Sequence, residues 1–139
     1  MGLELADTSA WTSRQRNPAV SHDFETRLLQ GEIATCPMVT LELLWEAQNA
    51  TRFQHRRERL EALVQLPIDE RAWRRATEVF ERLAQDGAFH HRRVKIPDLL
   101  IAAAAELTEV PVCHYDRDFE LIADVTGQPV RAIAPLGSL

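Results

Sequence analysis

Short apolar segments that alternate with helical patterns are the feature that most constrains the fold of this 139-residue chain. Four such segments have the length and composition of β-strands, and helical patterns separate them along the chain. Strands that alternate with helices indicate a parallel sheet with right-handed crossover connections. The predicted strands cover residues 3–7, 33–36, 110–114 and 130–134.

The helical patterns end at proline or glycine in several places, as helices commonly do. One of them, from Asp98 to Glu109, is apolar almost all round, which is typical of a helix buried inside a domain. Thr40 is a plausible cap for another. The length suits a single α/β domain over residues 1–139, with one active crevice. The other predicted helices cover residues 18–31, 40–47, 52–66, 69–86 and 119–125.

Composition excludes several classes of protein. A hydrophobic content of 45% with 27% charged residues is ordinary for a globular domain. The longest apolar run, Leu99 to Ala105, is too short to cross a bilayer, and acids stand where a signal peptide would be basic, so we expect a cytoplasmic protein. The net charge of −5 argues against unspecific adhesion to nucleic acid, so any nucleic acid must be held locally. Cys36 and Cys113 lack the spacing of zinc or redox motifs and are expected to be buried thiols.

Acids recur where the chain is expected to pass from strand to helix. Each has a structural interpretation as a helix cap, a first-turn anion or a turn residue. In an open α/β sheet, however, such junctions converge on one crevice, where unneutralised carboxylates would repel one another. Mg²⁺ or Mn²⁺ would remove that repulsion, and the all-oxygen donor set disfavours zinc. The acids are Asp7, Glu42, Asp98, Asp116 and Asp118.

A metal site of this kind can activate water and shield charge on a phosphate, which suits phosphodiester hydrolysis. The basic stretch over residues 90–95 directly precedes Asp98, and Arg92, Arg93 and Lys95 are interpreted either as a phosphate clamp or as a solvated loop. Thr8 and Ser9 are equally suited to orienting water and to capping a turn.

Other conspicuous residues favour structural interpretations. The arginines between residues 52 and 86 lie among acids, which predicts a solvated face with ion pairs. His114 is expected to be a satisfied, partly buried histidine. Trp11, Trp45 and Trp73 are expected in the core or at an interface rather than stacked on bases.

Four motifs resemble, in order and spacing, those of PIN-domain ribonucleases of the VapC toxin type. They cover residues 5–11, 39–44, 96–103 and 114–119, so the resemblance extends over essentially the whole chain. It implies an α/β/α sandwich and a Mg²⁺- or Mn²⁺-dependent endoribonuclease that acts on structured loops of tRNA or ribosomal RNA. It also implies a homodimer inhibited by a VapB-type antitoxin whose tail enters the crevice.

The resemblance also implies roles for the acids. Asp7 and Asp98 match the family's principal metal ligands. Glu42 matches the acid of the family's second motif and Asp116 the acid of its fourth motif, where the choice between Asp116 and Asp118 stays open. In this scheme Asp7, Asp98 and Asp116 hold the ion and Glu42 positions or deprotonates the attacking water. The family's sheet would place Cys36 and Cys113 on opposite flanks of the first strand, roughly 9 to 10 Å apart, too far for a disulfide.

Two alternatives compete with this interpretation. A small phosphatase of the haloacid-dehalogenase type would need an acid where Ser9 stands. A catalytically silent module with the same fold would have lost an acid, and none is missing. For the expected dimer or antitoxin surface, the large apolar residues Phe53, Trp73 and Phe80 are the candidates.

Overall fold

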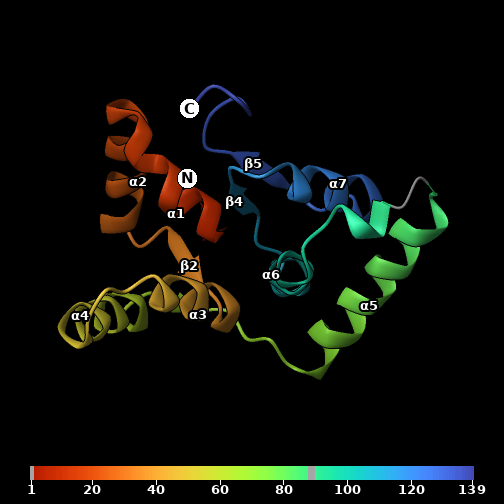
Figure 1. The fold of residues 1–139 in the computed structure, drawn as a ribbon, viewed down its shortest axis with the longest axis horizontal. Helices are drawn as coiled ribbons and strands as arrows, with labels where there is room; N and C mark the ends of the chain where they lie inside the picture. The colour runs from red at the N-terminus through yellow and green to blue at the C-terminus, as the bar shows by residue number, and fades with distance from the viewer. Residues whose placement is uncertain (1, 88–89) are drawn as a thin grey trace.

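The computed structural model describes residues 2–87 and 90–139, which form a five-stranded parallel sheet flanked by helices (Figure 1). The strand order is β3-β2-β1-β4-β5, so the first strand is central, and Leu5 pairs with both Ala34 and Val112. All carboxyl ends therefore lie at one edge. The strands are β1 (Glu4–Ala6), β2 (Ile33–Thr35), β3 (Val64–Gln65), β4 (Val112–His114) and β5 (Val130–Ala132).

Five of the α-helices begin where a polar side chain accepts a hydrogen bond from a free backbone N–H group, whereas α3 and α6 begin with a proline in the first turn and no such cap. Asp7, Asn17, Asn49, Asp69 and Asp116 cap α1, α2, α4, α5 and α7 in this way. The α-helices are α1 (Thr8–Ser13), α2 (Pro18–Leu29), α3 (Pro37–Trp45), α4 (Ala50–Glu61), α5 (Glu70–Gln85), α6 (Ile96–Leu107) and α7 (Arg117–Thr126), and the 3-10 turns are η1 (Arg14–Arg16) and η2 (His90–Arg92).

Helix α6 is the buried helix that the sequence predicts. Every residue from Asp98 to Ala105 is buried, and α5 and α7 pack against it. Figure 1 shows α6 nearly end-on near the middle of the molecule. The small side chains of its alanine run allow neighbouring elements to approach closely, so this helix fixes the position of its first turn and of Asp98.

The predicted helix over residues 52–66 is wrong in its last five residues. Helix α4 ends at Glu61, and Val64–Gln65 forms β3, where the Leu66 amide donates a 2.8 Å hydrogen bond to the Thr35 carbonyl. The spacing of Leu60, Leu63 and Val64 resembles a helix, but a strand of two residues is too short to show its own period. The sheet thus has one more edge strand than predicted.

The starts of α3 and α6, which carry predicted site residues, differ from prediction, and one short helix is additional. Helix α3 begins at Pro37 rather than Thr40, which makes Glu42 a mid-helix residue. Helix α6 begins at Ile96, so Asp98 lies inside its first turn and is not its cap. The six-residue α1 was not predicted, because it is shorter than two helical turns and has too few positions to show a periodicity.

The tryptophans divide between core and surface. Trp11 is buried and packs edge-on against Phe24 with ring centroids 4.9 Å apart. Trp45 and Trp73 are 87% and 56% exposed, so a core role is wrong for both. Cys36 and Cys113 are buried free thiols, as expected. Across residues 2–87 and 90–139, no helix has the length and apolarity needed to cross a membrane.

The apolar residues proposed for one contact surface are dispersed. Phe53 lies on α4 and Trp73 on α5, and these helices stand at opposite ends of the molecule's long axis (Figure 1). Phe80 is half-buried and packs edge-on against His91. The three residues do not form one continuous patch, and their place in a dimer or antitoxin surface stays a prediction.

At the amino end of β1, Glu4 forms ion pairs with two arginines. Glu4 accepts two 2.9 Å hydrogen bonds from Arg131 of β5, and Arg27 of α2 lies 2.8 Å from it. Glu4 and Arg27 are both buried. These ion pairs connect the central strand to an edge strand and to α2 at the end of the sheet remote from the acidic crevice.

Candidate active site

The carboxyl ends of β1 and β4 bring acids from distant parts of the chain together. Asp7 directly follows β1, and its amide donates a 2.9 Å hydrogen bond to the Cys113 carbonyl of β4. Asp116 follows β4 two residues after its end, and Asp118 lies in the first turn of α7. Asp98 enters from the first turn of α6.

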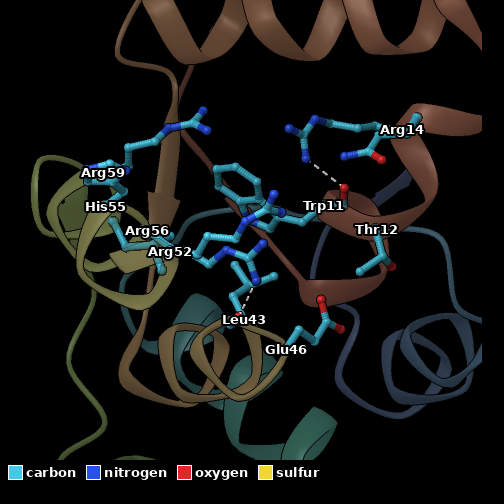
Figure 2. A pocket seen from close by; sticks show the side chains of 11 residues that line it. Trp11, Thr12, Arg14, Leu43, Glu46, Arg52, His55, Arg56 and Arg59 are labelled. Carbon is cyan, nitrogen blue, oxygen red and sulfur yellow. Dashed lines mark hydrogen bonds between the residues drawn. The ribbon is translucent and has the colours of Figure 1, made fainter. Parts of the chain in front are cut away.

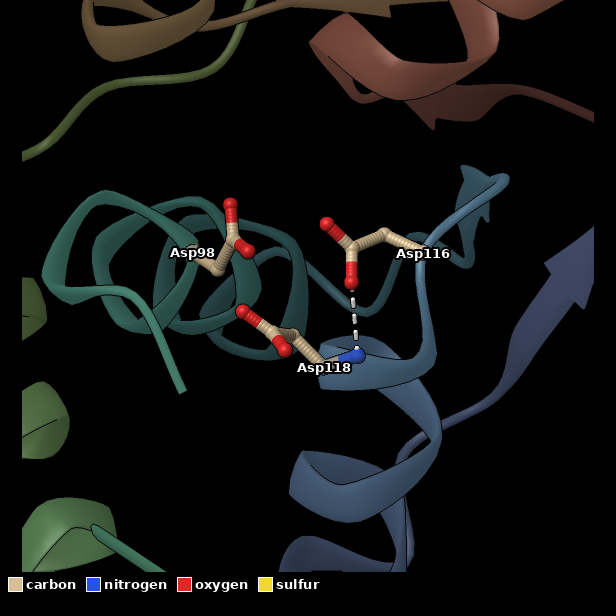
Figure 3. A group of neighbouring side chains, drawn as sticks. All are labelled: Asp98, Asp116 and Asp118. Atoms are coloured by element: carbon tan, nitrogen blue, oxygen red, sulfur yellow. Dashed lines mark hydrogen bonds between the residues drawn. The ribbon is translucent and has the colours of Figure 1, made fainter. Parts of the chain in front are cut away.

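Asp98, Asp116 and Asp118 form a compact cluster, called here the aspartate cluster. Each offers a carboxylate oxygen, and the three oxygens lie within 4.8 Å of one another. Figure 3 shows the side chains converging from α6, from the loop after β4 and from α7. Asp98 and Asp118 are buried, and Asp116 is half-buried while it accepts a 2.9 Å hydrogen bond from the Asp118 amide.

The Lys95 ammonium group lies against all three carboxylates. Its Nζ atom is 2.7 Å from Asp116 Oδ2, 3.0 Å from Asp118 Oδ2 and 3.4 Å from Asp98 Oδ2. Partial burial would lower the lysine pKa, but the hydrogen bonds to Asp116 and Asp118 outweigh it and raise that pKa above its usual range. One positive charge thus faces three potential negative charges.

The cluster is incompletely neutralised by this single cation. Burial raises the pKa of Asp98 far above its usual range, and a hydrogen bond shared with Asp118 and the charge of Asp7 raise it further. The pKa of Asp118 is lowered because hydrogen bonds from Asp98 and Lys95 outweigh the effect of burial. The raised pKa means that Asp98 binds a proton more readily than an ordinary aspartate, and a bound cation of higher charge would oppose that protonation.

Asp7 lies beside this cluster and is almost fully buried, with 2% of its surface exposed. Burial raises its pKa to about 6, although hydrogen bonds from the Ser9 hydroxyl and amide oppose that rise. The Ser9 Oγ atom also accepts a 2.8 Å hydrogen bond from the Tyr115 amide. Ser9 therefore connects Asp7 to the loop that carries Asp116, a role that the sequence left undecided.

Glu42 reaches the same region from the middle of α3. The Thr8 hydroxyl donates a 2.8 Å hydrogen bond to Glu42 Oε1, and the charge of Glu42 contributes to the raised pKa of Asp7. Thr8 thus orients a carboxylate across 34 residues of sequence. The structure brings all five predicted acids to one edge of the sheet, with Asp7 and Glu42 adjoining the aspartate cluster.

His114 supports the loop from the core. It is fully buried, and its Nδ1 atom accepts a 3.1 Å hydrogen bond from the Asp116 amide. Its Nε2 atom therefore carries the proton and donates to Glu120 at 3.1 Å. Burial lowers the pKa of His114, so the ring is neutral. The expected satisfied histidine is confirmed, and it is more deeply buried than predicted.

The basic stretch divides into two parts. Arg92 ends η2 and Arg93 follows it, and both side chains are exposed. Lys95 points into the aspartate cluster instead, an arrangement that the sequence did not predict. The spacing of Lys95 and Asp98 by three residues was the available signal, because such pairs share a helix face.

The donor set fits a hard divalent cation. Every group is a carboxylate oxygen, which Mg²⁺ and Mn²⁺ favour. Asp98 Oδ2 is buried and, among the described atoms, accepts no hydrogen bond. The raised pKa of Asp98, caused first by burial, and the Lys95 ammonium group beside it both indicate that this site attracts positive charge. Asp98, Asp116 and Asp118, with Asp7 beside them, are the residues that could hold an ion.

Comparison with known proteins agrees with this geometry. The PIN domain family model matches residues 5–125. The chain is 41% identical to the protein named ribonuclease VapC18 of Mycobacterium tuberculosis, with 96% of each chain covered, and 42% identical to ribonuclease VapC21 of the same species, with the same coverage. The chain belongs to the PIN-domain family, and within it to the VapC group.

Solved structures show the same fold. A VapBC-1 structure from nontypeable Haemophilus influenzae superimposes with a TM-score of 0.72 at 19% identity, covering 94% of this chain and 98% of the other. A VapBC-5 structure from Mycobacterium tuberculosis gives a TM-score of 0.57 at 26% identity, covering 95% and 98%. The single α/β/α domain is therefore confirmed as the architecture of the VapC group.

Proposed function

We propose that this chain is a Mg²⁺- or Mn²⁺-dependent endoribonuclease and the toxin of a VapBC-type toxin–antitoxin pair. The observation that carries the proposal is the aspartate cluster, in which three carboxylates with a buried, unsatisfied oxygen surround a lysine ammonium group. Relatives at 41% and 42% identity are named as ribonucleases, which supports RNA as the substrate class.

The ion would be held by Asp98, Asp116 and Asp118, with Asp7 completing the negative site. When bound, it would supply Lewis acidity toward a phosphodiester and an activated water molecule. The protein's own task is to keep the carboxylates close together despite their repulsion. It does so by anchoring Asp98 in the buried helix α6, Asp116 through the His114 hydrogen bond and Asp7 through Ser9.

Glu42 is proposed to position or deprotonate the attacking water. Its carboxylate lies outside the aspartate cluster and is oriented by the Thr8 hydroxyl, so it can contact a water molecule without itself being one of the clustered carboxylates. Arg92 and Arg93, exposed just before α6, are proposed to hold the RNA backbone. Lys95 could join them once an ion replaces it at the carboxylates.

The partner is proposed to be a VapB-type antitoxin, since structural neighbours are VapBC toxin–antitoxin complexes. Structured loops of tRNA or ribosomal RNA are the proposed targets, and a homodimer is the proposed assembly. Exposed Leu41 and Trp45 beside Glu42 offer apolar surface for a partner near the site.

The test is RNA cleavage in Mn²⁺ buffer by the parent and by Asp98→Asn. The variant keeps the shape of the side chain but removes a ligand charge, so we expect cleavage to fall at least a hundredfold while the fold is retained. Asp124→Asn, an exposed substitution of the same type on α7, is the matched control and should cleave like the parent. Equal cleavage by Asp98→Asn and the parent would contradict the proposal.

A further inference from the structure

A concave site lined mainly by basic side chains lies on the same domain as the acidic site described above. This pocket, of about 510 Å³, lies between α1 with η1, the end of α3 and one face of α4 (Figure 2). We call it the arginine pocket, after Arg14, Arg52, Arg56 and Arg59 in its lining. Glu46 is the acid among its described lining residues, and His55 and Trp11 also face it.

Helix α4 supplies a row of cations by its periodicity. Arg52, Arg56 and Arg59 are spaced at i, i+4 and i+7, which places them on one helix face. Seven residues of helix span about 10.5 Å, so the row is long enough to meet more than one negative group. Figure 2 shows these side chains extending from α4 toward Arg14 and Trp11 on the opposite wall.

The row is not neutralised from within the described protein. Arg52 and Arg59 are exposed, and among the residues that the structure describes neither has a carboxylate partner. Arg56 donates a 2.6 Å hydrogen bond to the Leu43 carbonyl, which fixes its position but leaves its charge unpaired. In contrast, the expected ion pairs do form outside the pocket, where Arg57 contacts Glu61 and Arg75 contacts Glu106.

Arg14 completes the opposite wall. It donates a 2.7 Å hydrogen bond to the Trp11 carbonyl and contacts Glu25 at 3.4 Å, while its Nε atom is buried with no hydrogen-bond partner in the described structure. Burial lowers its pKa, Glu25 opposes this, and the charges of Arg59 and Arg56 lower it further. An anion between the walls would relieve this repulsion.

The arginine pocket adjoins the proposed catalytic groups. Glu46 lines it and also lines a neighbouring, more open depression formed with Thr8, Leu41, Glu42 and Trp45. Helix α1, which Asp7 caps, carries Trp11 and Thr12 of the pocket wall. A chain-like anion in the arginine pocket could therefore continue past Glu42 toward the aspartate cluster.

We infer that the arginine pocket binds backbone phosphates of the RNA substrate on one side of the cleaved bond. The inference rests on the proposed function. Guanidinium groups bind phosphate oxygens in a bidentate manner, and a row of them matches a polyanion better than a single carboxylate. A net charge of −5 makes local binding of this kind necessary.

The test is RNA binding by Arg52→Ala/Arg59→Ala, made in the Asp98→Asn background so that the probe stays intact. The probe is a fluorescein-labelled, mixed-sequence RNA of 20 nucleotides, followed by anisotropy as salt is raised. We expect Kd to rise at least tenfold and the slope of log Kd against log salt to fall by about 1 to 1.4, since two phosphate contacts to a single strand are lost. Both arginines are exposed, so the fold should be retained.

The matched control is Arg57→Ala/Arg71→Ala, which removes the same charge from exposed sites on α4 and α5 outside the pocket. It should bind the RNA probe within twofold of the Asp98→Asn parent. Equal weakening in both double variants, unchanged binding in the pocket variant, or no binding of the probe by the parent would each overturn the inference.

Two further measurements separate this inference from its alternatives. A polyglutamate peptide of matched charge should bind at least tenfold more weakly than RNA. Equal affinity for the two would overturn the inference that the pocket binds RNA and would favour an acidic protein segment as its ligand. Cleavage by the chain with intact Asp98 is measured in parallel. If the chain fails to cleave RNA but RNA binding still depends on Arg52 and Arg59, only the nuclease proposal is contradicted. If cleavage depends on Asp98 but the Arg52→Ala/Arg59→Ala variant binds RNA normally, only the inference about the arginine pocket is contradicted.

Discussion

Lys95 and Asp98 show how closely charge is balanced at the scale of single residues. The lysine contacts three carboxylates, yet the pKa of Asp98 is raised because the effect of burial exceeds that of one nearby positive charge. A divalent ion would bring twice that charge. Metal binding would therefore displace the ammonium group and oppose protonation of Asp98, so the ion must compete with the lysine and with protons.

Replacing Lys95 by Met should accordingly tighten Mn²⁺ binding about tenfold, a change of about 1.4 kcal/mol, because the competing cation is gone. Isothermal titration calorimetry at pH 7 measures this directly. Arg93→Met, on the same loop but outside the cluster, is the control and should change affinity little. Weaker Mn²⁺ binding in Lys95→Met would show that the lysine supports the ion instead.

Asp7 makes stability depend on pH in a defined direction. In the folded chain its pKa is about 6, against 3.8 ordinarily, so between these values the folded state binds more protons than the unfolded state. Raising the pH through this window removes stability, and the loss is complete above about pH 6. Asp7→Asn should therefore gain up to about 3 kcal/mol relative to the parent between pH 4 and pH 7 in EDTA.

Urea unfolding at pH 4, 5, 6 and 7 measures that difference. The exposed substitution Asp124→Asn should show a constant difference from the parent over the same range. If the difference for Asp7→Asn were also constant, Asp7 would have an ordinary pKa in the folded state.

At the scale of elements, long helices could be predicted from the sequence, whereas the shortest helix and strand could not. The apolar run of α6 identified a buried helix, and the alternation of strands and helices predicted a parallel sheet. The place of β1 between β2 and β4 was implied only by the resemblance to VapC toxins. Strand β3 and helix α1 contain two and six residues, too few to display a period. The position of each acid at the sheet edge followed from topology, but the contact of Lys95 with Asp116, 21 residues away, depends on how α6 packs beside α7.

The ion pairs at the amino end of β1 should stabilise three elements at once. Glu4→Ala removes the nearer carboxylate of the buried Arg27 and leaves it Glu32 at 3.7 Å, so we expect a loss of about 3 kcal/mol in the free energy of unfolding. Glu61→Ala removes an exposed ion pair with Arg57 and should cost about 0.5 kcal/mol or less. Chemical denaturation of both variants measures the difference, and equal losses would mean that the buried pairs add nothing.

At the scale of the whole molecule, metal should stabilise the fold by mass action. An ion that binds only the folded state at a hundred times its Kd adds about 2.7 kcal/mol, or roughly 5 to 10 °C in Tm for a domain of this size. Differential scanning fluorimetry with Mn²⁺ should show this shift in the parent and little of it in Asp98→Asn. A full shift in Asp98→Asn would mean that Asp98 is not a ligand.

Strand β1 is three residues long and carries an acid at each end, and the two acids differ in their ion pairing. Arginines that belong to the fold neutralise Glu4, whereas Asp7 has no ion-pair partner among the described residues and the neighbouring aspartate cluster has Lys95, which a bound ion would displace. The two ends of the sheet should therefore differ in their local opening. Chelation should speed hydrogen–deuterium exchange at residues 96–98 and 116–118, while amides around Glu4 remain protected. A partner that needs a loosened crevice would then recognise the metal-free toxin without any change at the other end of the domain.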